Sequence, residues 1–227
     1  MPAPLHIGLL LFPDLTQLDA TGPYEVFARI PGARVHLVAK SAAPVACEQG
    51  LAIVPTATLD DAPPLDVVCV PGGVGVNAVM EDDATLAFLR RQASSARFVT
   101  SVCTGALALG AAGLLRGYRA TTYWMALDFL RAFGAEPVAE RVVIDRDRIT
   151  GGGVTAGIDF GLIIARELCG EAAARAIQLQ IEYDPAPPFD SGSPRTADPA
   201  LVARLRAAAQ TRQDERRSVV ERAAARL

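Results

Sequence analysis

The chain has 227 residues, of which 51% are hydrophobic, and a formal net charge of −3 at pH 7. A chain of this length can build one sizeable α/β core, and its acidic balance argues against the basic surface typical of nucleic-acid binding. No apolar run approaches the ~20 residues that span a bilayer, and no secretion signal precedes the first strand, so we expect a cytoplasmic protein without a membrane partner.

The first half of the chain alternates apolar runs of strand length with helical segments. Residues 5–12 are almost all apolar, which is typical of a parallel strand buried on both faces. Residues 16–29 are expected to form a helix with an irregularity at Gly22-Pro23. The further elements predicted here are a strand over 35–39, a hairpin from 45–48 and 51–54, a strand over 66–70 and a helix over 85–96.

The second half continues the alternation and ends in an arginine-rich helix. The arginine excess of residues 201–227 indicates a solvated helix face or docking on a partner subunit. Together the elements predict an α/β fold with a mostly parallel central sheet covered by helices on both sides. The elements expected here are a strand over 98–102, a helix over 105–113, an extended segment over 119–124, a helix over 125–133, strands over 141–145 and 148–150, helices over 155–168 and 172–183, and a loop over 184–198 rich in Pro, Ser, Gly and Asp.

The candidate nucleophile lies between the strand over 98–102 and the helix that follows it. Cys103 and Thr104 occupy that junction. Unpaired N–H groups and the dipole at a helix N-terminus favour an anion, so we expect a thiolate there. A tight strand-to-helix turn is the geometry of a nucleophile elbow, here with cysteine instead of serine. A buried, inert cysteine is the alternative, but the position favours the nucleophile.

A proton acceptor for this cysteine is harder to find. The chain has two histidines, His6 and His36. Both fall in predicted strands, where histidine is more often structural than catalytic, so a Cys-His-Asp triad is poorly supported. Asp19 follows the first strand and therefore lies at the same carboxyl end of the sheet as the elbow, where burial would tune its pKa toward neutrality. A helix-capping role for Asp19 is equally consistent with its position. The weaker carboxylate candidates are Glu25 and Asp159.

Glycines follow the strand over 66–70 and are candidates for binding substrate. Without a Cβ, Gly72 and Gly73 let backbone N–H groups approach a ligand, although they also suit a tight turn. Thr104 is expected to act through its N–H, its hydroxyl or both, with Gly73 as a second oxyanion donor. Gly151-Gly152-Gly153 lacks the spacing of a nucleotide-binding motif. The cysteines, Cys47, Cys69, Cys103 and Cys169, predict neither a metal site nor a disulfide framework.

Several of these segments resemble one known superfamily. The elbow at 101–105, Ser-Val-Cys-Thr-Gly, with Val-Pro-Gly-Gly at 70–73, resembles the DJ-1/PfpI superfamily. Residues 18–25, Leu-Asp-Ala-Thr-Gly-Pro-Tyr-Glu, resemble the branch that includes isonitrile (isocyanide) hydratases. The similarity runs over essentially the whole chain, and its other segments are 120–122, 149–153, 156–159 and 185–189.

The resemblance implies a flavodoxin-like three-layer sandwich that forms a homodimer. It implies hydration of a small-molecule isonitrile to an N-substituted formamide without metal or organic cofactor. By position it assigns the nucleophile to Cys103, the essential aspartate to Asp19 and a third functional position to Thr104. We accordingly expect residues 1–183 to form the catalytic domain, with 184–227 as a Pro-rich arm and C-terminal helix of the same domain. This branch often carries histidine where the chain has Tyr123, and the substrate range differs if that histidine contacts substrate.

Other members of the superfamily suggest different functions. A reactive, accessible thiolate also suits a redox or stress-response protein whose cysteine is oxidised. A transcriptional regulator would need an additional DNA-binding domain. The segment after Asp184 is too short for such a domain and lacks a helix-turn-helix pattern.

Overall fold

The central feature of the computed structural model, which describes residues 4–227, is a seven-stranded sheet. Its strands are β1 (Leu5–Leu10), β2 (Ala33–Ala39), β5 (Ala57–Thr58), β6 (Val67–Val70), β7 (Phe98–Val102), β10 (Val142–Asp145) and β11 (Arg148–Gly151). Their order across the sheet is β10-β11-β7-β6-β1-β2-β5. Only the edge pair β10–β11 is antiparallel within this sheet, so the expected mostly parallel arrangement is confirmed.

The sheet is formed by the apolar runs of the sequence. In β1, Ile7 and Leu9 are fully buried and pair in register with Val67 and Cys69 of β6. β6 pairs in turn with β7, whose residues Val99 and Val102 are also fully buried. Such runs suit central parallel strands because helices cover both faces. The carboxyl ends of β1, β6 and β7 therefore meet at one edge of the sheet.

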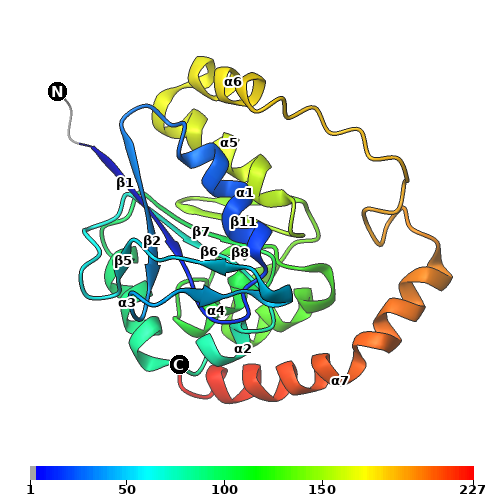
Figure 1. Ribbon diagram of the computed structural model, residues 1–227. Helices are drawn as coiled ribbons and strands as arrows, with labels where there is room; N and C mark the ends of the chain where they lie inside the picture. Colours follow the sequence, from blue (N-terminus) through cyan, green and yellow to red (C-terminus); the bar gives the residue numbers. More distant parts are fainter. Residues whose placement is uncertain (1–3) are drawn as a thin grey trace.

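Helices form the two outer layers (Figure 1). The helices α1 (Gln17–Phe27), α5 (Ala156–Cys169) and α6 (Glu171–Gln180) pack together on one side. The other side carries α2 (Val76–Val79), α3 (Asp83–Ala93), α4 (Gly105–Ala111) and the 3-10 helix η2 (Trp124–Phe133), with α7 (Pro199–Ala224) along their outer surface. This arrangement is the expected three-layer sandwich.

Local details differ from the expectations in a few places. At the expected irregularity, Gly22-Pro23, α1 does not end but continues through the proline, which has no N–H to donate to the preceding turn. The extended segment over 119–124 shortens to β8 (Arg119–Ala120), which pairs with β9 (Glu136–Pro137). The predicted hairpin is confirmed as β3 (Val45–Ala46) and β4 (Ala52–Ile53).

The last segment of the chain is an arm followed by a long helix. Residues 184–198 form no helix or strand and run outside the body in Figure 1. Asp198 caps α7 by accepting a hydrogen bond from the N–H of Ala200 over 2.8 Å. The expected solvated face of α7 is confirmed by the mostly exposed residues of the helix, and its opposite face is buried, with Val219, Val220 and Ala223 in the same core as the sheet. Within the described range 4–227, the helices are too short or too polar to cross a membrane.

Candidate active site

Cys103 lies on a tight turn between β7 and α4. Its φ of 51° is in the left-handed region, which is costly for a residue with a Cβ. Two hydrogen bonds hold it there: its N–H donates to the carbonyl of Gly151 over 3.1 Å, and the hydroxyl of Thr122 donates to its carbonyl over 2.6 Å. A Cβ at Gly105 would lie 2.1 Å from the carbonyl oxygen of Val70, so only glycine fits the start of α4. The turn therefore has the strained geometry of a nucleophile elbow.

Asp19 is the carboxylate that the fold brings to this turn. It lies in the first turn of α1 and is fully buried. Its Oδ2 accepts a hydrogen bond from the N–H of Gly72 over 2.8 Å. Its Oδ1 has no hydrogen-bond partner within the described part of the chain, although the thiol of Cys103 is near enough to lower the pKa of this carboxyl group. The bond to Gly72 ties α1 to the loop after β6, which favours a role in the site over a helix cap.

Burial changes the proton affinity of Asp19. Desolvation raises its pKa from the ordinary 3.8 to about 7, because a buried carboxylate loses its hydration. The Gly72 N–H and the thiol of Cys103 lower this pKa, and the charge of Glu48 raises it. Asp19 is therefore a carboxyl group that gains and loses a proton near neutral pH, as general acid-base catalysis requires.

The thiol of Cys103 does not follow the expectation of a resting thiolate. The side chain is only 6% exposed. Burial raises its pKa, and the negative charge of Asp19 raises it further. The N–H of Thr104 and the charge of Arg216 lower it, but burial outweighs them. Cys103 and Asp19 thus titrate as a coupled pair that retains a proton, and a thiolate forms when that proton moves to the carboxylate.

The glycines after β6 hold the pair in place. The N–H of Gly72 donates to Asp19, and the N–H of Gly73 donates to Thr104 Oγ1 over 3.0 Å, while that hydroxyl donates back to the Gly73 carbonyl over 3.2 Å. Both N–H groups are thus hydrogen-bonded within the protein, and their role as donors to a reacting oxygen stays a prediction. A Cβ at Gly72 would lie 2.5 Å from the Thr104 nitrogen, so glycine is required for the close approach. The N–H of Thr104 instead acts on the sulfur of Cys103.

The weaker candidates lie outside this site. His6 Nδ1 and His36 Nε2 hydrogen-bond each other over 2.9 Å on β1 and β2, and His6 is at the opposite end of β1 from Asp19. Glu25 forms an ion pair with Arg29 on the exposed side of α1. Asp159, on α5, pairs with Arg141 and accepts a hydrogen bond from Tyr183. The hydrogen bond between His6 and His36 agrees with the expectation that both histidines are structural.

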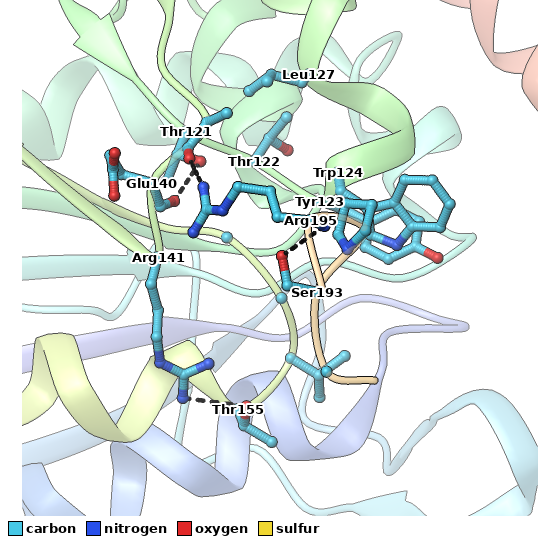
Figure 2. A pocket seen from close by; sticks show the side chains of 16 residues that line it. Thr121, Thr122, Tyr123, Trp124, Leu127, Glu140, Arg141, Thr155, Ser193 and Arg195 are labelled. Carbon is cyan, nitrogen blue, oxygen red and sulfur yellow. Dashed lines mark hydrogen bonds between the residues drawn. The ribbon is translucent and has the colours of Figure 1, made fainter. Parts of the chain in front are cut away.

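A cavity of about 420 Å³ lies beside the turn. It does not include Cys103, but Thr122, which donates to the Cys103 carbonyl, and the neighbouring Tyr123 line it. Figure 2 shows the arm residues Ser193 and Arg195 among the side chains of this cavity. The arm thus forms part of the wall of a cavity that lies beside the elbow.

Sequence reasoning missed Arg216 of α7. Its side chain is 3% exposed, its Nε donates to Asn77 Oδ1 over 3.0 Å, and its Nη2 lies 3.5 Å from the carbonyl oxygen of Gly73. The signal was its register, since buried Ala209 and Ala223 lie seven residues to either side of it. The buried face of α7 therefore places a charged side chain, Arg216, in the core.

Comparisons with known proteins agree with this architecture. Residues 6–167 match the sequence model of the DJ-1/PfpI family. The chain belongs to the DJ-1/PfpI family. It is similar to an isonitrile hydratase of Pseudomonas putida, with 57% identity over 223 residues that cover 98% of each chain. A crystal structure of a ThiJ/PfpI family protein from Pseudomonas syringae superimposes with a TM-score of 0.93 at 44% identity, covering 96% of this chain and 91% of the other.

A less similar relative is a transcriptional regulator. An HTH-type transcriptional regulator, GbdR of Pseudomonas aeruginosa, is 36% identical over 188 residues. The match covers 78% of this chain but 51% of the regulator. The similarity to the regulator is therefore confined to about half of that protein.

Proposed function

We propose that this member of the DJ-1/PfpI family is an isonitrile hydratase, which converts R–N≡C and water to the formamide R–NH–CHO. The observation that carries the proposal is the buried pair of Cys103 and Asp19, whose carboxyl pKa of about 7 suits proton transfer in both directions. The similarity to the hydratase of Pseudomonas putida over 98% of both chains supports the same chemistry.

The first half of the reaction forms a covalent intermediate. The thiol proton of Cys103 moves to Asp19, and the sulfur attacks the terminal isonitrile carbon, which is electrophilic and sterically open. Asp19 then delivers the proton to that carbon, giving the thioimidate R–N=CH–S–Cys103. The N–H of Thr104 stabilises negative charge on the sulfur while it is a thiolate. Splitting one difficult addition into two easier steps is the advantage of covalent catalysis.

The second half releases the product. The Asp19 carboxylate accepts a proton from water as the water oxygen attacks the thioimidate carbon, and it passes that proton to the substrate nitrogen. The tetrahedral intermediate R–NH–CH(OH)–S–Cys103 then collapses: the C–S bond breaks, the hydroxyl proton returns through Asp19 to the sulfur, and R–NH–CHO leaves. Because each proton passes through Asp19, this mechanism works without a histidine.

The cavity beside the elbow is the proposed site of the substituent R. Its wall at Thr122 is hydrogen-bonded to Cys103, and Tyr123, Trp124 and Leu127 supply aromatic and apolar surface. The aromatic and apolar part of this mixed lining suits the alkyl or aryl group of an isonitrile, and the polar side chains beside it, such as Glu140 and Arg141, can orient the substrate. Tyr123 is then in a position to affect the substrate range.

We also propose that the protein is a homodimer and that residues 184–227 belong to the same domain as 1–183. The buried side chains of α7 support the second statement. The arm supports the first, because Phe189 is 78% exposed on a segment that runs outside the body (Figure 1). Light scattering at micromolar concentration should give twice the chain mass of 23.9 kDa, whereas a monomer mass would refute the dimer.

The decisive experiment for the activity is a direct assay. Purified protein is incubated with a simple alkyl isonitrile, and the formamide proton is followed by NMR, with Cys103→Ala as the inactive control. Turnover by the parent and none by the variant is the expected result. Absence of turnover by the parent, together with ready oxidation of Cys103, would favour a redox function instead.

A further inference from the structure

We infer that Arg216 of α7 is a positioning residue of this site, whose buried guanidinium stabilises the thiolate of Cys103 and braces the loop at Gly73. The effect of Arg216 on turnover rests on the proposed function, whereas its effect on the thiol of Cys103 does not. Neither the elbow nor the loop after β6 contains a cation, so the charge comes from the last helix of the chain.

The burial of Arg216 requires compensation. A guanidinium is always charged in proteins and has five N–H donors, and burying it without a counter-charge is costly. In the structure its hydrogen-bond acceptors are the neutral oxygens of Asn77 and Gly73. Within residues 4–227 no carboxylate oxygen lies within 4.0 Å of it. Negative charge formed on the nearby sulfur would supply the missing counter-charge.

A short series of hydrogen bonds connects Arg216 to the elbow. Its Nη2 approaches the Gly73 carbonyl, which also accepts the hydroxyl of Thr104, and Thr104 directly follows Cys103. The Nε of the same guanidinium donates a hydrogen bond to Oδ1 of Asn77 on α2. Arg216 therefore contacts both ends of the segment 73–77, whose first residue is hydrogen-bonded to the neighbour of Cys103.

The buried face of α7 is apolar except for two polar side chains, Arg216 and Gln213. Ala209, Val220 and Ala223 pack as apolar side chains. Between them lie Arg216 and, one turn earlier, Gln213, whose amide nitrogen and oxygen are both buried without a hydrogen-bond partner in the described chain. Buried unpartnered amides are rare in native proteins. A second polar group on the same face supports a functional role for this part of α7 rather than simple packing.

The other charged groups around the sulfur come from several elements. Asp19 on α1 raises the pKa of Cys103, and Arg216 lowers it. Glu48, on the 3-10 turn η1 (Glu48–Gly50), acts on both Asp19 and Arg216. The charges of Cys103, Arg212 and Arg216 all affect the pKa of Tyr123. Among these groups Arg216 is the buried cation, so its removal should raise the pKa of the thiol.

The test measures the pH dependence of Cys103 alkylation by iodoacetamide, with the modified peptide quantified by mass spectrometry. Peptide mapping separates Cys103 from the partly exposed Cys169. We expect Arg216→Met to raise the midpoint of the alkylation profile by about one pH unit or more, and to slow alkylation at pH 7.5 by about tenfold. Arg216→Lys keeps the charge without the planar fork and should have a smaller effect. Arg222→Met, an exposed arginine of the same helix, is the matched control.

The outcomes discriminate between the roles. A folded Arg216→Met protein with the parent's midpoint overturns the inference. If the methionine variant does not fold, Arg216→Gln, which retains a donor for Asn77, replaces it and is judged by the same midpoint. Because alkylation needs no isonitrile, failure of the parent to hydrate an isonitrile would refute the proposed function and leave this result intact.

Discussion

Replacing Asp19 with asparagine should separate the proposed chemistry from the fold. Asparagine has the shape of aspartate and retains an oxygen that can accept the N–H of Gly72, now 2.8 Å from Oδ2. It has no titratable proton. The variant should therefore keep the loop after β6 in place while removing the group that moves protons between sulfur, carbon and water.

The expected effects on activity and stability have opposite signs. Losing a general acid-base group typically lowers a rate by about 10²–10⁴-fold, and we expect kcat/KM for isonitrile hydration to fall in that range. Because the folded pKa of Asp19 is raised, the folded state binds its proton more tightly than the unfolded state, and stability declines as pH rises from about 4 to 7. A rise from 3.8 to about 7 corresponds to an upper bound of about 4 kcal/mol. Asp19→Asn should therefore be more stable than the parent at pH 8, and little different at pH 4.5.

The assay combines formamide formation with urea unfolding at both pH values. Asp60→Asn, an exposed carboxylate away from the site, is the matched control. Cys103 of the variant should still be alkylated, since the N–H of Thr104 and Arg216 continue to favour the thiolate. Hydration at the parent's rate would show that another residue moves the protons. A variant less stable than the parent at pH 8 would refute the account of the buried carboxyl.

Three further substitutions test the remaining assignments. Cys103→Ala should abolish turnover with the fold intact by circular dichroism, while Cys169→Ala retains it. Thr104→Val leaves the buried N–H of Gly73 without its acceptor; it should cost about 1–3 kcal/mol in urea unfolding and lower kcat, and parent-like behaviour would assign Thr104 a backbone role alone. Tyr123→His should change the relative kcat/KM values for alkyl and aryl isonitriles, and an unchanged ratio would remove Tyr123 from the substrate contacts.

The strands and the elbow could be predicted from sequence because their signals are local. Residues 5–12 and 98–102 are apolar runs of strand length, and the order of the parallel strands brings Asp19 and Cys103 to the same edge of the sheet. The pairing of His6 with His36 also agrees with the structural reading of strand histidines.

Other features depend on contacts that no local pattern encodes. The N–H groups of Gly72 and Gly73 looked available for a ligand until the fold placed Asp19 and Thr104 against them. The resting thiolate was expected from the helix N-terminus, but burial of the thiol outweighs that effect. Arg216 was hidden among the many arginines of α7, because one buried position in a charged helix differs from its neighbours only by register.

The left-handed backbone at Cys103 has a practical consequence for engineering this protein. Glycine is the residue that adopts a φ of 51° without steric penalty, so Cys103→Gly relieves about 1 kcal/mol or more of strain and removes the nucleophile in the same step. A library selected only for heat resistance would therefore enrich inactive clones at this position. A selection for a more heat-stable variant of this protein therefore has to select for turnover as well, from the first round.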